Sequence, residues 1–178
     1  MKVYRGTQQV LKEAQRALSA KPLVPGVPAP LAMVAEALRA GRQYSRVAIY
    51  LAGKDGLVLE ACSGEGAGAG TELARQVMKT GKPEPLDGVL SRRPMEIALP
   101  IELGGQVAAV LETRADATGF AREDQMLLKE VARRLRIFLS ERGKYLCQRA
   151  RLLDSTRSQR RPQMSAGTAA RRAAAGER

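Results

Sequence analysis

One stretch of the chain has the residue types and spacing of a phosphate-binding loop. Residues 64–69 read GEGAGA, which matches the pattern GxGxxA of dinucleotide-binding folds. In those folds the glycines let the backbone approach a pyrophosphate at a helix N-terminus, and an acidic residue about 20 positions later, here Asp87, contacts the ribose. No good strand precedes Asp87, however. A flexible glycine loop is therefore the favoured interpretation, with dinucleotide binding as the alternative.

Histidine and cysteine offer little for catalysis or metal binding. The 178 residues contain no histidine, which removes Ser-His-Asp triads, Cys-His pairs and His-containing zinc sites. The two cysteines, Cys62 and Cys147, are far apart in the sequence and lack metal-binding spacing, so we expect buried apolar roles for both. The sequence thus predicts no catalytic residue, no metal and no enzymatic activity. It identifies no cofactor.

Positive charge is concentrated near the C-terminus. Of the net charge of +12, residues from Arg142 onward contribute +8, because ten Lys or Arg side chains stand against Asp154 and Glu177. Residues 154–178 have almost nothing apolar to bury, which predicts a basic disordered tail. Such a tail is suited to binding nucleic acid or an acidic membrane surface through phosphates, without base stacking because it has no aromatic residue; the alternative is that it only aids solubility. The candidate contacts are Arg157, Arg160, Arg161, Arg171 and Arg172.

The sequence contains no signal for insertion into a membrane. The N-terminal residues have no apolar core of signal-peptide length, and no later stretch approaches the length of a membrane span. These observations predict a cytoplasmic protein.

A scaffold for these residues is indicated around Met95–Glu112, MEIALPIELGGQVAAVLE. Two apolar runs flank Gly104 and Gly105, which is typical of a β-hairpin. Neither run alternates cleanly between polar and apolar residues, so we expect both faces of this hairpin to be buried in the centre of a sheet.

The remaining elements follow from similar patterns. Strands at Ser45–Leu51 and Leu57–Cys62 form a second hairpin, in which Val47, Ile49 and Leu51 share one face and Arg46, Ala48 and Tyr50 the other. Thr71 is the expected N-cap of a short helix to Lys79. A further helix begins at Leu31 and is expected to stop at Gly41.

Both ends of the fold are predicted to be helical and to mediate dimerisation. Residues 1–20 form an amphipathic helix, and the prolines of residues 21–30 make an extended linker that detaches it from a domain at residues 31–153. The last helix carries a stripe that includes Leu135, Phe138 and Leu139. Apolar stripes outside the core of one domain favour a homodimer through the terminal helices.

Four segments, in order, resemble the GAF domain family over residues 31–142. The central hairpin is similar to the family's pattern through Glu96, Ile97, Pro100, Ile101, Val107, Ala108 and Leu111. SRVAIYLAGKDGLVLEACSG resembles its first two strands, and MKTGKPEPLD its helix end and loop. GFAREDQMLLKEVA resembles its final helix through Phe120, Asp124, Leu127, Leu128, Val131 and Ala132. The resemblance implies an α/β (α+β) fold with a GAF/PAS-like antiparallel sheet, terminal helices on one face and a short helix and loop as a lid on the other.

The sequence also departs from the family. Ala108 stands where members usually carry Gly, and Ala121 stands where the final helix often begins with Ser or Thr. The Asn-Lys-Phe-Asp-Glu set of cyclic-nucleotide-binding members and the Cys set of the family's methionine sulfoxide reductases are not found. Neither activity is therefore carried over to this chain.

The resemblance implies a small-molecule pocket on the sheet face away from the terminal helices. Candidate lining residues are Tyr50, Cys62, Met78 and Met95, and Arg92 belongs to a group of cations near the lid that hints at an anionic ligand. For the apolar side chains, however, simple core packing is the favoured interpretation, and for the cations it is a solvated mixed surface, with the pocket as the alternative. The expected function is a non-enzymatic sensor or regulatory module that binds a small ligand or an output protein, and the alternative is a nucleic-acid-associated protein acting through its tail.

Overall fold

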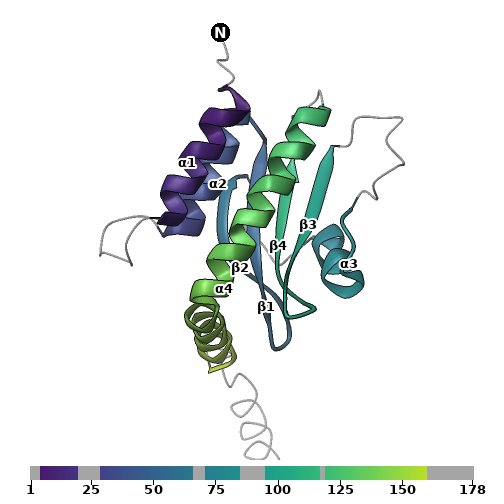
Figure 1. The fold of residues 1–178 in the computed structure, drawn as a ribbon. Coiled ribbons are helices and arrows are strands. Elements are labelled where there is room, and N and C mark those ends of the chain that lie inside the picture. Colours follow the sequence, from purple (N-terminus) through teal and green to yellow (C-terminus); the bar gives the residue numbers. More distant parts are fainter. Residues whose placement is uncertain (1–4, 20–28, 66–70, 85–94, 117–118, 160–178) are drawn as a thin grey trace, which may run out of the picture.

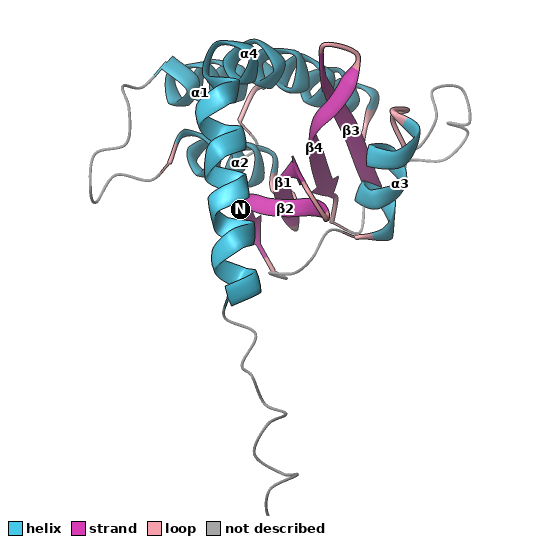
Figure 2. Ribbon diagram, turned by 90° about the horizontal axis from the view of Figure 1, so that it is seen from below, coloured by secondary structure: helices cyan, strands magenta, loops and turns pink. Residues whose placement is uncertain are grey.

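A four-stranded antiparallel sheet lies between three helices on one face and one on the other (Figures 1 and 2). The computed structural model describes residues 5–19, 29–65, 71–84, 95–116 and 119–159, with side chains as far as Glu141. Helices α2 and α4 pack on one face of the sheet, α1 lies on the same side against α2 and α4, and α3 covers the other face. The elements are α1 (Thr7–Ser19), α2 (Pro30–Arg42), β1 (Arg46–Gly53), β2 (Gly56–Gly64), α3 (Glu72–Thr80), β3 (Glu96–Leu103), β4 (Gln106–Arg114) and α4 (Arg122–Gln159).

The strand order is β2-β1-β4-β3, so β1 and β4 are the inner strands. The predicted central hairpin is confirmed: Gly104 and Gly105 have φ values of 60° and 78°, which suit the tight turn that joins β3 to β4. Within this hairpin only β4 is central, because β3 is the last strand of the described sheet. Glu84 adds a single antiparallel bridge to Ala98 on the outer edge of β3.

The alternation predicted for β1 is also confirmed. Val47, Ile49 and Leu51 belong to the core under the three helices, whereas Ala48 and Tyr50 belong to the core under α3. Each strand residue thus has a fixed side of the sheet, because successive side chains of a strand point to opposite faces.

The glycine-rich stretch does not follow a dinucleotide-binding topology. The strand before it, β2, pairs antiparallel with β1, whereas a dinucleotide fold needs parallel strands joined by a helix. Gly64 ends β2 with φ of 101°, and a Cβ built on it would lie 2.2 Å from the carbonyl oxygen of Ser45. Residues 66–70 and Asp87 lie outside the described residues. The backbone geometry at position 64 therefore requires a glycine, without any need for a bound phosphate.

Gly41 packs against a neighbouring helix and does not end its own, which corrects the sequence-based expectation. It is buried within α2, and a Cβ at this position would lie 2.5 Å from a methyl carbon of Val10 in α1. The helix ends after Arg42, where Gln43 adopts the left-handed conformation (φ 57°) and its N–H bonds the carbonyl of Arg39. At the other end Pro30 starts α2, although it was expected to close the linker, because proline is favoured in the first turn.

The first helix is part of the core, which corrects the expectation that a linker detaches it. Val10 and Ala14 are fully buried, and α1 packs against α2 and α4. The stripe of α4 that includes Leu135 and Leu139 is buried in the same core. These stripes therefore need no second copy of the chain to cover them. The homodimer remains a prediction, but the apolar stripes of α1 and α4 no longer support it.

Helix α4 is 38 residues long, and its last turns extend beyond the sheet (Figure 1). The tail was expected to begin at residue 154, but residues 154–159 continue the helix; residues 160–178 lie outside the described residues. The helix-favouring run Arg149–Leu153 directly precedes these residues, and the helix continues from it through Gln159. In the described part of the chain no helix combines the length and the apolar character needed to cross a membrane.

The start of α4 has half of a capping box. The carboxylate of Asp124 accepts a hydrogen bond of 3.0 Å from the backbone N–H of Ala121, and the N–H of Gln125 bonds the carbonyl of Ala121. Ala121 is thus at the N-cap, where its methyl group cannot accept a bond from the first-turn amides.

We expect Ala121→Ser to raise the free energy of unfolding by ~1 kcal/mol, because serine would complete the capping box. Thermal and urea denaturation followed by circular dichroism would measure the change. Ala121→Val, which adds no side-chain acceptor and is as poor an N-cap residue as alanine, is the control. An unchanged midpoint in the serine variant would contradict the assignment of Ala121 as the N-cap.

Candidate functional site

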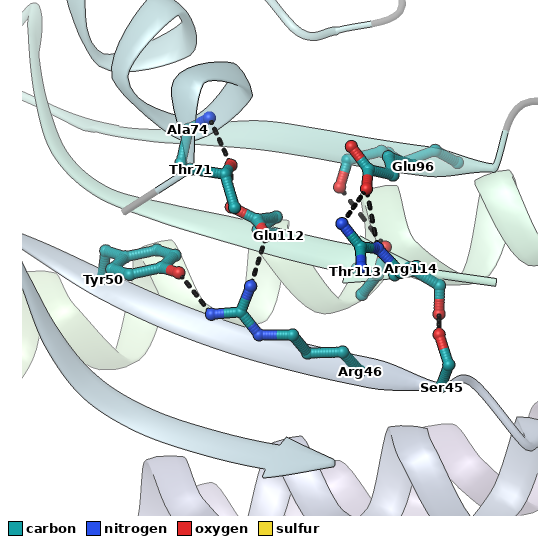
Figure 3. Close-up of polar contacts among 10 residues, drawn as sticks. Ser45, Arg46, Tyr50, Thr71, Ala74, Glu96, Glu112, Thr113 and Arg114 are labelled. Carbon is teal, nitrogen blue, oxygen red and sulfur yellow. Dashed lines mark hydrogen bonds and ion pairs between the residues drawn. The ribbon is translucent and has the colours of Figure 1, made fainter. Parts of the chain in front are cut away.

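Two opposite charges are buried together on the α3 face of the sheet. Arg46 of β1 and Glu112 of β4 are 8% and 4% exposed. Arg46 Nη1 donates a hydrogen bond of 3.2 Å to Glu112 Oε1, and Arg46 Nη2 donates one of 2.8 Å to the hydroxyl of Tyr50 (Figure 3). The strand periodicity explains this arrangement, since Arg46 and Tyr50 are four residues apart on β1 and share a face.

The second oxygen of Glu112 connects this ion pair to α3. The hydroxyl of Thr71 donates a hydrogen bond of 2.6 Å to Glu112 Oε2. The same hydroxyl oxygen accepts from the backbone N–H of Ala74 at 3.2 Å, which confirms the predicted N-cap (Figure 3). The N-terminus of α3 is therefore attached to the sheet through Glu112, and any change in the position of Glu112 also acts on the helix.

Apolar side chains surround this polar group. The sheet and α3 together bury a small cluster separate from the main core. Its buried members are Ala48, Tyr50, Ala74, Val77, Ala98 and Val110, and its partly buried members are Leu57, Leu59, Cys62, Leu73, Met78 and Val107. Because so little water reaches Arg46 and Glu112, their interaction is stronger than that of a surface pair. Removing either charge would leave the other buried without compensation.

The electrostatics of the cluster keep Arg46 charged and Tyr50 protonated. Burial opposes the charge of Arg46, but hydrogen bonding with Cys62 and electrostatic attraction to Tyr50 and Glu112 outweigh it and raise the arginine pKa. Burial raises the pKa of Tyr50, and the negative charge of Glu112 raises it further. The Tyr50 hydroxyl accepts from Arg46 and retains its own proton as a donor.

The hydrogen bonds of Arg46 leave part of its donor capacity unused. A guanidinium has five N–H groups in a fixed planar arrangement. Among the described residues, the guanidinium bonds Glu112, Tyr50 and the side chain of Cys62, whereas Nε is buried without a hydrogen-bond partner. A buried donor without an acceptor is unfavourable by about 1–3 kcal/mol, more where the group is charged. The site is thus suited to a further acceptor.

The structure brings together three of the five predicted pocket residues. Tyr50, Cys62 and Met78 all belong to the α3-face cluster. Met95 does not: it precedes the first residue of β3, and it is 45% exposed among the described residues. Arg92 lies outside the described residues. Of the tail candidates, Arg157 falls in α4 beyond the described side chains, and Arg160, Arg161, Arg171 and Arg172 are outside the description altogether.

Arg46 and Glu112, the central charges of this site, were not singled out from the sequence, and Thr71 was predicted only as an N-cap. A signal was present, since Arg46 shares a strand face with Ala48 and Tyr50, and Glu112 shares one with Val110. A charged residue on an inward face needs a partner. Which residue supplies it depends on the pairing of strands 66 positions apart, and periodicity alone does not give that pairing. No group of metal-ligating side chains occurs among the described residues.

Comparison with solved structures identifies the fold. The GAF domain of an Acinetobacter phosphoenolpyruvate-protein phosphotransferase matches with a TM-score of 0.58 and 11% identity, over 77% of this chain and 94% of that one. The Neisseria meningitidis free methionine-R-sulfoxide reductase, solved with its substrate, matches with a TM-score of 0.62 and 19% identity over 82% and 99%. The Staphylococcus aureus reductase, also with substrate, gives 0.60 and 16% over 78% and 99%. Neither the protein-family models nor the curated proteins contain a match to the sequence. The chain has a GAF-like fold.

These neighbours correct the expectation that the chain is not an enzyme. Free methionine-R-sulfoxide reductases are enzymes with this fold, so the fold is compatible with catalysis. The sequence argument was too narrow because it considered histidine-dependent groups, metal sites and paired cysteines. Enzymes also use other nucleophiles and acids, including carboxylates, lysine and tyrosine.

Proposed function

We propose that this GAF-fold chain is a ligand-binding regulatory module. Its ligand is a small molecule with a carboxylate or carbonyl oxygen, bound between the sheet and α3 over Arg46. The observation that carries this proposal is the unused donor capacity of a buried guanidinium, with Nε unpaired among the described residues. Carboxylates and carbonyls are the acceptors that arginine binds best, and a desolvated site strengthens such bonds.

The purely structural alternative explains these contacts less well. A buried ion pair is a weak source of stability, because taking both charges out of water offsets most of their attraction. Well-packed apolar side chains would fill the same space with equal or greater stability. Retaining Arg46 and Glu112 inside an apolar cluster, with donors to spare, is more readily understood if a third group binds there.

The contacts of Glu112 provide a route from ligand to response. A ligand oxygen on Arg46 competes with Glu112 for the guanidinium, and Glu112 holds the hydroxyl that caps α3. Ligand binding would therefore change how firmly the N-terminus of α3 is attached to the sheet. A helix whose attachment depends on a bound molecule is a suitable element for regulation.

Native mass spectrometry of the protein purified from its host tests the proposal, because a retained small molecule would appear as a defined mass increment. Thermal-shift measurements with a panel of small carboxylic acids and amides extend the test. The panel includes free methionine sulfoxide, with its reduction measured in the presence of a thiol, because free methionine-R-sulfoxide reductases share the fold. We expect a retained molecule or a panel compound to raise the melting temperature.

Two arginines on the same sheet provide matched variants. Arg46→Lys keeps the positive charge but loses the planar donor array, so we expect ligand binding to weaken about tenfold or more. Arg114→Lys changes an exposed arginine of β4 that pairs with Glu96, and it should leave binding unchanged. The proposal would be contradicted if the folded wild-type protein neither retained nor bound any of these molecules, or if both variants bound ligand equally well.

A further inference from the structure

A second feature lies on the opposite side of the sheet from α3, between the outer edge of β3 and α4. It is a groove of about 500 Å³, which we call the β3–α4 groove. Its apolar part consists of Pro83 before the Glu84 bridge, Leu99, Pro100 and Ile101 on β3, and Ala132 on α4. The groove shares no residue with the Arg46 cluster, so it is a separate place on the molecule from the proposed ligand site.

The helix side of the groove is basic. Lys129, Arg133 and Arg136 are exposed and occur at spacings of four and three along α4, so they lie along one face of the helix. Arg133 forms an exposed ion pair with Glu130. On the β3 side the acidic residue is Glu102. An apolar floor beside three cations favours a partner that is both apolar and acidic.

The outer edge of β3 limits how such a partner binds. The N–H and C=O of Ala98 are already paired with Glu84, at 2.7 and 2.9 Å. Residues two apart on a strand direct their backbone groups to the same edge, so Pro100 occupies the next outward position, where it offers no N–H. Proline at an edge position blocks the addition of another strand. Recognition at this groove must therefore rely on side chains.

We propose that the β3–α4 groove docks an acidic peptide segment of a partner protein. An aliphatic side chain of the peptide enters between Ile101 and Ala132, and its carboxylates lie against Lys129, Arg133 and Arg136. A nucleic acid fits less well, because the apolar floor offers nothing to a sugar-phosphate backbone and the groove has no aromatic side chain for base stacking.

Fluorescence anisotropy with labelled synthetic peptides tests this docking. The probe carries two leucines flanked by glutamates; one comparison peptide has glutamine in place of glutamate, and another has serine in place of leucine. The protein is the full chain. We expect the glutamate-leucine peptide to bind at least about tenfold more tightly than either comparison peptide, since charge and apolar burial both contribute.

Variants of the protein locate the binding. The double reversal Lys129→Glu/Arg136→Glu affects exposed positions and should weaken binding about tenfold or more. Arg16→Glu/Arg122→Glu makes the same change in net charge at exposed helix positions outside the groove, and it should have a smaller effect. Ala132→Met fills the floor without changing charge and should also weaken binding.

The outcomes distinguish docking from general attraction. Equal weakening by the two double reversals, or equal binding of the leucine and serine peptides, would overturn the proposal. It would also be overturned if a labelled DNA duplex bound more tightly than the peptide and lost that binding in Lys129→Glu/Arg136→Glu, because the groove would then be a nucleic-acid surface. If Ala132→Met fails to fold, the comparison of the two double reversals still distinguishes docking from general attraction.

Discussion

Replacing Glu112 with alanine is expected to lower the free energy of unfolding by about 3–5 kcal/mol, the usual effect of breaking a buried ion pair from one side. The variant leaves the guanidinium of Arg46 buried without its carboxylate, and it also removes the acceptor of the Thr71 hydroxyl. Urea denaturation followed by circular dichroism would measure the loss. Because Thr71 caps α3, hydrogen exchange should show the largest local increase at the start of that helix.

A matched pair on the same sheet serves as the control. Glu96→Ala removes the carboxylate of the ion pair with Arg114, whose side chains are 37% and 52% exposed, and should change stability by less than about 1 kcal/mol. In the double variant Arg46→Met/Glu112→Leu, apolar side chains replace both charges, and much of the lost stability should return. A loss in Glu112→Ala no larger than in Glu96→Ala would refute the description of Glu112 as a buried partner.

The double variant also separates stability from ligand binding. If the Arg46–Glu112 pair existed only to hold the sheet and α3 together, the apolar double variant would keep the function of the chain. If the pair provides donors for a ligand, the same variant would be stable and unable to bind. The two roles of the site therefore predict different results for one folded protein.

The resemblance to GAF domains predicted the overall architecture correctly. Beyond that, the details that the sequence predicted correctly are those determined locally. The faces of β1 follow from the two-residue period of a strand, and the β3–β4 turn follows from the backbone freedom of Gly104 and Gly105. Thr71 is similar, since an N-cap depends on a side chain and an amide three residues later. In each case the physical cause lies within a few residues of its effect.

The parts that the sequence did not predict depend on distant contacts. Gly41 was expected to end α2 because glycine often follows the last turn of a helix. Its lack of a side chain instead makes room for Val10 of α1. The apolar stripe of α1 was predicted correctly. That the core of the same domain covers this stripe was not predicted. Arg46 and Glu112 became a site only when β1 and β4 were paired. Patterns in one segment show that a surface will be buried, but not which surface covers it.

One further long-range contact gives the largest effect expected outside the candidate site. Asp124, in the first turn of α4, accepts hydrogen bonds on one oxygen from Arg42 Nε at 2.7 Å and from the hydroxyl of Tyr44 at 3.0 Å. Burial and the negative charge of Asp124 raise the pKa of Tyr44, which keeps this hydroxyl protonated. The other Asp124 oxygen holds the Ala121 N–H. One carboxylate thus connects the start of α4 to the junction of α2 and β1.

Asp124→Ala is therefore expected to lower the free energy of unfolding by about 3 kcal/mol or more, because it leaves Arg42 and Tyr44 without their shared acceptor at a largely buried position. Glu123→Ala, which removes an exposed carboxylate from the same helical turn, is the matched control and should cost only the helix-dipole contribution of about 0.3–1 kcal/mol. A double-mutant cycle with Arg42→Met measures the coupling between the two side chains, which we expect to exceed about 1 kcal/mol. Additive effects of Asp124→Ala and Arg42→Met would instead mean that this ion pair does not connect α4 to the rest of the fold.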